Sequence, residues 1–475
     1  MHAIPRCAAG LLRGAWLAFL IGWAPRGVAL GATRSDTKSL PSCVSATQIV
    51  DLARSLTSAS GDSDSYPAVV GMLFGKKADA SPGLTAYEEN RSFVYALGSP
   101  SPHLVRRVVI LKPSTLVIED ETLAGSENDN MLCLDSKSKP EVSGRRVHID
   151  VGDRQLVWET LAPRESNYHT SHPPPDGPAP EKYVMQSIAP GMTRFLHVLC
   201  VNSRSGQASS SPHFELSQEA SDWKLRVSTG NRVFRLTLPP PVVGPGEIAI
   251  SDTKGKTLMA HRPLPSGILP HGLEGIRLLD RWDADYRGQT PPVWDIGRPA
   301  DELQRIVRQG IVHACRVVDL GCGSGTDAIY LASQGFDVTA IDISPTALGQ
   351  AEEKARKARV SVRWVLADVL APPHLESFDF IYDRGCYHNV RDQSLTAYIE
   401  TVRRLSHPGT KFLLLSARRD ETAAADAPGV TEEELRFDFH SLFDVESLRE
   451  IKLETNRTSV SPPGWSAFML RNTNP

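Results

Sequence analysis

Residues 319–326 read Asp319-Leu320-Gly321-Cys322-Gly323-Ser324-Gly325-Thr326, and this glycine-rich stretch decides the fold of the C-terminal part of the chain. A β-prone run, Arg316–Leu320, leads into the stretch, and apolar residues at helical spacing follow it. Strand, glycine turn and helix in this order let the backbone come close to a nucleotide-like ligand. The next predicted strand, Val338–Ile341, ends in Asp342, whose carboxylate can accept hydrogen bonds from both hydroxyls of a ribose. The pattern predicts alternating strands and helices around a parallel sheet.

The spacing of the three glycines separates two classes of nucleotide-binding domain. It is G-x-G-x-G and not the G-x-G-x-x-G that wraps a dinucleotide pyrophosphate, which counts against a dehydrogenase. A third predicted strand ends in Asp368. Together these features resemble the class I S-adenosylmethionine-dependent methyltransferases. The resemblance implies a Rossmann-like α/β domain with a seven-stranded mixed sheet over residues 281–475; a generic α/β domain and a dehydrogenase remain the alternatives.

The resemblance also implies the cofactor, S-adenosyl-L-methionine, and the residues that bind it. The glycine backbone would pack against the methionyl and ribose parts, Asp319 would lie near the amino group, and Asp342 would hold the ribose hydroxyls. Asp368 and Val369 would meet the adenine edge. The implied cofactor-binding set is Trp282, Tyr286, Trp294, Asp319, Gly321, Gly323, Gly325, Asp342, Ile343, Asp368, Val369 and Asp383. Cys322 is interpreted as a small filler and not a nucleophile, and no metal site is predicted.

The segment before the glycine loop contains Arg281–Tyr286 and Thr290–Asp295, which read RWDADY and TPPVWD. It resembles the N-terminal lid of the thiopurine and tellurite-resistance methyltransferase group. The resemblance implies that Trp282, Tyr286 and Trp294 cover the methionyl end of the cofactor, where aromatic faces would attract a sulfonium cation. For Tyr286 alone, a helix that packs on the sheet through its aromatic residues is the alternative.

The fourth predicted strand, Phe378–Tyr382, runs into Asp383-Arg384-Gly385-Cys386-Tyr387-His388-Asn389. Ligands of open parallel sheets bind beyond the carboxyl ends of the strands, so this run should face the methyl group. It resembles the acid-Arg-Gly-x-aromatic-His run of the same small-molecule group, and the candidate catalytic residues are Asp383, Arg384 and His388. His388 could remove a proton from an acceptor near neutral pH, or it could make only a hydrogen bond within the loop.

The N-terminal part has a different pattern. Residues 67–262 contain short β-prone runs separated by turn signals, which predict an antiparallel β-sandwich. The run from Val105 to Asp120 is similar to the C-terminal β-sandwich of heparinase II/III-type polysaccharide lyases, which implies carbohydrate contact. The chain leaves no room for the helical toroid of such lyases, so lyase activity is not expected. Residues 33–66 are predicted to be a surface leader and residues 263–280 a Pro/Gly linker.

The length of the chain, its charge and its N-terminal residues restrict the class of protein and its location. The chain has 475 residues, with 52 Lys+Arg against 55 Asp+Glu, which excludes a strongly basic surface for bulk nucleic-acid binding. A mean hydropathy of −0.23 excludes a polytopic membrane protein. Residues 1–32 combine Arg6 and Arg13 with an apolar run and small residues, which predicts a signal peptide and export or membrane association. The location would be cytoplasmic if the signal is not cleaved or the start site is wrong. The seven cysteines show no regular spacing, which argues against a disulfide framework.

The function predicted from these features is methyl transfer from S-adenosyl-L-methionine to a small-molecule acceptor such as a thiol or chalcogen compound. The alternative is a carbohydrate-associated or cell-wall-binding β-sandwich protein with a vestigial cofactor domain. The expected partners are a small-molecule acceptor and carbohydrate at the sandwich, with no nucleic acid and no transmembrane partner. No Asn/Asp-Pro-Pro-aromatic run follows the fourth strand, which disfavours methylation of nucleic-acid amino groups.

Overall fold

The computed structural model describes residues 43–57, 66–74, 83–122, 132–170, 183–188, 193–204, 212–419, 429–457 and 461–473. The predicted signal peptide, residues 1–32, lies outside these ranges. Within them, none of the helices combines the length and the apolar character needed to cross a membrane.

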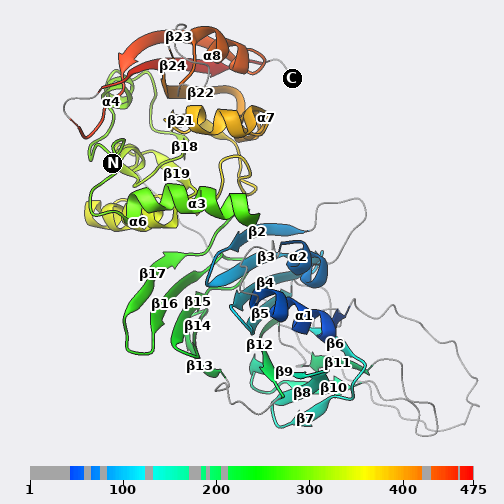
Figure 1. Cartoon of the computed structure of the whole chain (residues 1–475). Helices are drawn as coiled ribbons and strands as arrows, with labels where there is room; N and C mark the ends of the chain where they lie inside the picture. Colours follow the sequence, from blue (N-terminus) through cyan, green and yellow to red (C-terminus); the bar gives the residue numbers. More distant parts are fainter. Residues whose placement is uncertain are drawn as a thin grey trace, which may run out of the picture. The chain divides into compact units, whose positions relative to one another are not determined.

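The described residues up to Pro263 form mainly antiparallel β structure in sheets of four, eight and five strands (Figure 1). The four-stranded sheet runs β1 (Val44–Ser45), β6 (Cys133–Ser136), β11 (Tyr183–Ile188), β10 (Asn167–Thr170). The eight-stranded sheet runs β2 (Leu84–Glu89), β3 (Phe93–Ser101), β4 (Leu104–Leu111), β5 (Thr115–Thr122), β12 (Arg194–Ser203), β9 (Arg154–Ala162), β8 (Arg146–Val151), β7 (Glu141–Ser143). The five-stranded sheet runs β13 (His213–Glu219), β14 (Asp222–Thr229), β15 (Arg232–Leu238), β16 (Glu247–Asp252), β17 (Thr257–Pro263).

The eight-stranded and five-stranded sheets share one apolar core. Phe93 and Val109 from the first sheet belong to the same buried cluster as Trp223, Phe234 and Ile248 from the second. Residues that alternate with these along β3, β4 and β5 belong to a second buried cluster, so both faces of the central strands of the eight-stranded sheet are removed from water. The antiparallel strands predicted for residues 67–262 are confirmed, whereas a heparinase-like sandwich stays a prediction.

The predicted surface leader, residues 33–66, is wrong for residues 46–57. Helix α1 (Ala46–Thr57) buries Ala46, Ile49, Val50 and Ala53, which lie at positions i, i+3, i+4 and i+7 and so share one face. A second helix, α2 (Tyr66–Leu73), follows it and adds Val69 to the same cluster. The Ser, Thr and Asp residues that suggested a leader lie between and beside these apolar positions.

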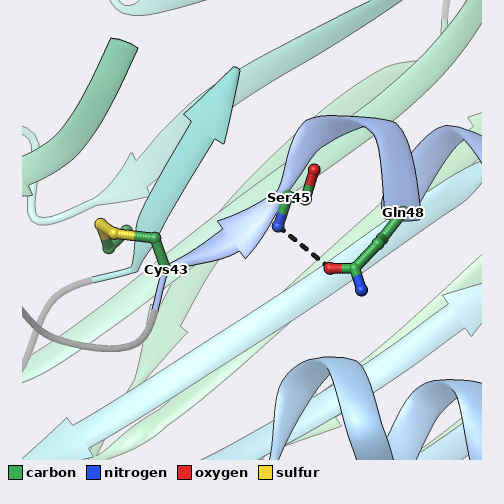
Figure 2. The surroundings of a disulfide bond; sticks show 4 residues. Cys43, Ser45 and Gln48 are labelled. Atoms are coloured by element: carbon green, nitrogen blue, oxygen red, sulfur yellow. Dashed lines mark hydrogen bonds between the residues drawn. A yellow bond between two sulfur atoms is a disulfide. The ribbon is translucent and has the colours of Figure 1, made fainter. Parts of the chain in front are cut away.

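A disulfide joins Cys43, just before β1, to Cys133 at the start of β6, 90 residues apart in the chain (Figure 2). The same stretch turns into α1, where the Ser45 backbone N–H donates to Gln48 Oε1 at 3.4 Å (Figure 2). The cysteine argument against disulfides is therefore wrong for this pair. Among the cysteines of the described ranges, Cys200, Cys315, Cys322 and Cys386 are free, and Cys43 and Cys133 are linked.

The C-terminal part is an α/β domain around a seven-stranded sheet. Its strands run β20 (Arg363–Leu366), β19 (Asp337–Asp342), β18 (Arg316–Leu320), β21 (Phe378–Arg384), β22 (Ser406–Ala417), β24 (Pro463–Arg471), β23 (Phe443–Lys452). The first five are parallel, and β24 is antiparallel to both β22 and β23. The helices are α3 (Gly272–Arg287), α4 (Asp301–Arg308), α5 (Thr326–Ser333), α6 (Pro345–Ala358), α7 (Tyr387–Leu405) and α8 (Glu432–Phe439). Because α3 begins at Gly272, the linker is shorter than the predicted 263–280.

The strand order places the functional site. In the sheet, β19 and β20 lie on one side of β18, and β21 and β22 lie on the other. The strand order therefore reverses its direction at β18. At such a switch point the loops after neighbouring strands diverge, and a crevice opens at their carboxyl ends. The glycine stretch follows β18, Asp342 ends β19, and the run Asp383–Asn389 spans the end of β21 and the start of α7.

Candidate cofactor and acceptor site

The glycine loop is held in a shape that other residues would not easily adopt. Gly321 and Gly323 have φ of +71° and +55°, in the left-handed region that favours glycine. A Cβ atom on Gly321 would lie 2.6 Å from the Cβ of Cys386, and one on Gly323 would lie 2.5 Å from the hydroxyl oxygen of Tyr286. The backbone of this loop therefore touches both the loop after β21 and helix α3.

Asp319, in β18 beneath this loop, supplies an unsatisfied buried carboxylate. The residue is 2% exposed, and within the described chain its Oδ2 atom has no hydrogen-bond partner. Burial raises its pKa well above the ordinary value, and the nearby carboxylates of Asp327, Asp383 and Asp342 raise it further. A cationic N–H donor beside the open Oδ2 atom would favour ionisation of this carboxyl group, and the amino group of S-adenosylmethionine provides such a donor.

Asp342, at the end of β19, shapes the glycine loop directly. Its Oδ2 accepts from the Gly323 backbone N–H at 2.7 Å, and its Oδ1 accepts from the Ser344 N–H at 2.8 Å. Burial raises its pKa to about 6, although these hydrogen bonds act in the opposite direction. Contact between Asp342 and the ribose hydroxyls stays a prediction. In the structure the same carboxylate also links the loop after β18 to the loop after β19.

Of the remaining predicted cofactor-binding residues, Ile343 lies beside a residue of this loop. Ile343 packs beside Cys322 against the small apolar cluster that contains Leu348 and Leu366. Asp368 accepts from the Leu370 N–H at 2.9 Å, and Val369 is buried in the main core of the domain. Cys322 is partly buried, and burial and nearby carboxylates raise its pKa well above the ordinary thiol value, which suits a filler and not a nucleophile.

The raised pKa of Asp342 gives a pH dependence for cofactor binding. If the ribose needs the ionised carboxylate, a pKa of about 6 leaves only about one molecule in ten competent at pH 5. We therefore expect the affinity for S-adenosylmethionine to rise about tenfold from pH 5 to pH 7, as measured by calorimetry. Asp342→Asn should bind weakly at both values without that rise. An affinity that is equal or lower at pH 7 in the unaltered chain would contradict the assignment.

The three predicted lid aromatics do come together at the glycine loop. Tyr286 is buried at the end of α3, and the Trp294 indole N–H donates to its hydroxyl oxygen at 2.9 Å. The ring of Trp294 meets those of Trp282 and Tyr286 edge-on, with centroid separations of 5.9 Å and 6.5 Å. The Tyr286 hydroxyl lies against Gly323, so this cluster covers the loop where the methionyl part of the cofactor is expected.

Sequence reasoning missed the polar side chains that fasten the lid. The Ser324 hydroxyl of the glycine loop donates to Asp295 Oδ2 at 2.6 Å. Asp283 Oδ1 accepts from the Ser344 hydroxyl at 2.7 Å and from the Thr346 N–H at 2.9 Å, at the N-terminus of α6. Both aspartates lie inside the RWDADY and TPPVWD motifs beside the aromatics, so the signal was present in the sequence but was read only for its aromatic residues.

The carboxylate of Asp383 accepts hydrogen bonds from the turn into α7. Asp383 is fully buried, and its carboxylate accepts from the N–H groups of Cys386 at 2.9 Å and Tyr387 at 3.0 Å. The Tyr398 hydroxyl donates to Oδ2 at 2.6 Å, and burial raises the pKa of Asp383 to about 7. Both oxygens hold the turn into α7, which favours a positioning role over the predicted catalytic one.

The Arg384 guanidinium binds two backbone carbonyl groups. It donates to the carbonyl oxygen of Trp294 at 3.0 Å and to that of Glu454 at 2.9 Å. These contacts tie the lid to the loop after β23. They favour a part in closing the site over contact with the acceptor.

His388 lies at the start of α7. The Ala417 backbone N–H donates to its Nδ1 atom at 3.3 Å, and burial lowers its pKa to about 4. Its Nε2 atom lies 3.4 Å from the Asn389 amide nitrogen, which donates to the Gly385 carbonyl oxygen at 2.6 Å. Both ring nitrogens therefore face N–H groups. A buried imidazole with this lowered pKa is a weak base, which does not favour the predicted role as a base.

Comparisons with known proteins place this domain. A family model described as a methyltransferase domain matches residues 317–409. The chain is 29% identical over 203 residues to 2-heptyl-1-hydroxyquinolin-4(1H)-one methyltransferase of Mycobacteroides abscessus, a match that covers 40% of this chain and 88% of that protein. It is 25% identical over 118 residues to the probable S-adenosyl-L-methionine-dependent methyltransferase TehB of Haemophilus influenzae, covering 25% of this chain and 41% of that protein.

A third relative is the probable thiol methyltransferase 2 of Arabidopsis thaliana, 26% identical over 142 residues, with 30% of this chain and 62% of that protein covered. The chain thus spans less than two thirds of two of these three relatives. The matched family model begins in β18 and includes the glycine loop, Asp342 and the turn into α7. The C-terminal part of this chain is a class I S-adenosylmethionine-dependent methyltransferase domain, and its cofactor is S-adenosyl-L-methionine.

Proposed function

We propose that the chain transfers the sulfonium methyl group to a small-molecule acceptor that arrives already ionised, such as a thiolate or another chalcogen anion. The observation that carries this proposal is the burial of His388 with N–H groups facing both of its ring nitrogens, because an imidazole in this environment, with its pKa lowered to about 4, is a poor base. Asp383, another candidate catalytic residue, accepts hydrogen bonds on both of its oxygens. Neither residue is therefore placed to take a proton from the acceptor during transfer.

The proposed reaction moves no proton. The anion attacks the methyl carbon in line with the carbon–sulfur bond, that bond breaks, and its electron pair stays on sulfur to give neutral S-adenosylhomocysteine. In the tautomer that carries its hydrogen on Nε2, His388 would donate a hydrogen bond that orients the anion. Alignment of the two reactants and exclusion of water by the lid can supply about 7–11 kcal/mol of the barrier.

The relatives support this acceptor class. One is named as a thiol methyltransferase, and another acts on a hydroxyquinolinone that carries a hydroxyl group on its ring nitrogen. Thiols and such hydroxyl groups are more acidic than alcohols, so both can reach a site as anions. The acceptor of this chain is our proposal and rests on the His388 environment together with these names.

A series of aryl thiols of graded acidity tests the proposal. We expect the midpoint of the pH profile of kcat/KM to follow the pKa of each thiol. His388→Phe should lower kcat/KM about tenfold or more, the cost of one hydrogen bond to a charged group, without moving that midpoint. His440→Phe, at the end of α8, is the matched control and should change neither quantity. If the midpoint stayed the same for thiols of different pKa, or moved when His388 was replaced, the reaction would depend on an enzyme base.

The alternative of a carbohydrate-associated protein with a vestigial cofactor domain is not favoured. It would leave unexplained the open Oδ2 atom of Asp319 and the clustered lid aromatics. Carbohydrate contact by the antiparallel sheets remains a separate proposal, supported by the similarity of the run Val105–Asp120 to the heparinase II/III-type sandwich.

We also propose that the chain is exported. The charge and apolar pattern of residues 1–32 supports this, and so does the Cys43–Cys133 disulfide, because structural disulfides persist mainly in oxidising compartments. Cytoplasmic retention predicts that both thiols are reduced in protein taken from the producing cell.

A further inference from the structure

Asn456, in the loop between β23 and β24, binds the lid through its side chain and its backbone N–H. The Asn456 amide nitrogen lies 2.7 Å from the carbonyl oxygen of Pro292, 3.2 Å from that of Asp295 and 3.3 Å from that of Pro291. The Asn456 backbone N–H donates to the Val293 carbonyl oxygen at 2.9 Å. One asparagine thus serves four carbonyl groups of the lid.

Among the carbonyl groups of residues 291–295, Arg384 binds the one that Asn456 does not contact. It donates to the Trp294 carbonyl oxygen and, with its other terminal nitrogen, to the Glu454 carbonyl oxygen in the Asn456 loop. Five consecutive carbonyl groups, from residue 291 to residue 295, are therefore held by Asn456 and Arg384, which we call the carbonyl clasp. Within the segment, the Pro292 carbonyl oxygen also accepts from the Asp295 backbone N–H at 2.9 Å.

The side chains of the same segment reach the glycine loop. Trp294 donates to the Tyr286 hydroxyl, which lies against Gly323, and Asp295 accepts from Ser324. The clasp fixes the backbone from which both side chains project. A shift of that backbone would move the aromatic cover and the Asp295–Ser324 contact together.

We propose that Asn456 is a positioning residue for the cofactor, because the carbonyl clasp sets how firmly the lid holds S-adenosylmethionine on the glycine loop. Asn456 lies 135 positions beyond the first glycine of the loop and touches neither the loop glycines nor Asp342 in any contact described above. Its influence would act through Trp294 and Asp295. The inference rests on the cofactor site and not on the identity of the acceptor.

Release of bound cofactor from the full chain tests this inference. We expect Asn456→Ala to bind S-adenosylmethionine about tenfold more weakly, with most of the change in the rate constant of release measured by stopped flow. Asn456→Asp should be weaker still, since its carboxylate would face carbonyl oxygens where the amide now donates. KM for the cofactor should rise more than kcat falls. Asn472→Ala, the same change beside Arg471 at the end of β24, should behave like the unaltered chain.

Two further results decide the matter. Equal release rates in the unaltered chain, Asn456→Ala and Asn456→Asp would overturn the proposal. If Asn456→Ala also lowers the unfolding temperature, Asn456→Gln, which keeps the amide donor, must restore slow release, and failure to do so would count against a positioning role. An unaltered chain that binds cofactor but methylates no thiol would instead contradict the proposed acceptor and leave this inference standing.

Discussion

Replacing Asp319 with asparagine should weaken binding of S-adenosylmethionine by about 100-fold or more without destabilising the ligand-free chain. The change removes the charge that would pair with the buried amino group, and losing one partner of a buried charge pair costs about 2–5 kcal/mol. In the described chain the Oδ2 atom has no partner to lose, and its pKa is raised well above the ordinary value by burial and by neighbouring carboxylates. Binding and stability should therefore change independently.

Calorimetry of the cofactor and denaturant unfolding of the same full-length variant would measure both quantities. Asp337→Asn is the matched control, because this exposed aspartate lies at the opposite end of the neighbouring strand β19. The assignment fails if Asp319→Asn binds the cofactor like the control. It fails equally if the loss of binding is accompanied by a matching loss of stability, since that would make Asp319 a structural residue.

Breaking the Cys43–Cys133 disulfide should cost about 4 kcal/mol of folding stability in the N-terminal part, the chain-entropy expectation for a long closed loop. The bond fixes the chain just before β1 and α1, whose buried residues form one cluster with those of the large sheet. Cys43→Ser, Cys133→Ser and the double variant should lose the same amount in denaturant unfolding, because each removes the same link.

Cys315→Ser, at a free and partly exposed cysteine, is the control for that series. Unequal losses in the two single variants would show that one thiol has another role. Alkylation of the native protein without reductant should leave Cys43 and Cys133 unlabelled if the chain is exported. Labelling of both would contradict the export proposal and would not affect the assignment of the methyltransferase domain.

The part of the site that the sequence predicted is the part made by short stretches of chain. The positive φ of Gly321 and Gly323 and the place of Asp342 at the end of β19 follow from residues that are neighbours along the chain. Local spacing carries that information, so the glycine loop and its acids could be named in advance. The sequence did not predict helix α1, because polar residues fill the positions between its apolar ones.

The parts that could not be predicted depend on distant backbone. His388 accepts at Nδ1 from the Ala417 N–H, and the lid is held by Asn456, far beyond the lid motif in the chain. Arg384 lies inside a recognised motif, but it binds backbone carbonyl groups, which a pattern of side chains does not predict. Its catalytic role stays a prediction.

The most direct test of the account is the product balance of one reaction. The full chain, radiolabelled S-adenosylmethionine and an acidic aryl thiol should yield S-adenosylhomocysteine and the methylated thiol in equal amounts, at a rate that depends on enzyme concentration. The account predicts this one-to-one release above the uncatalysed background, and its loss in Asp319→Asn at the same cofactor concentration. Formation of neither product by a chain that binds the cofactor would contradict methyl transfer to an ionised thiol.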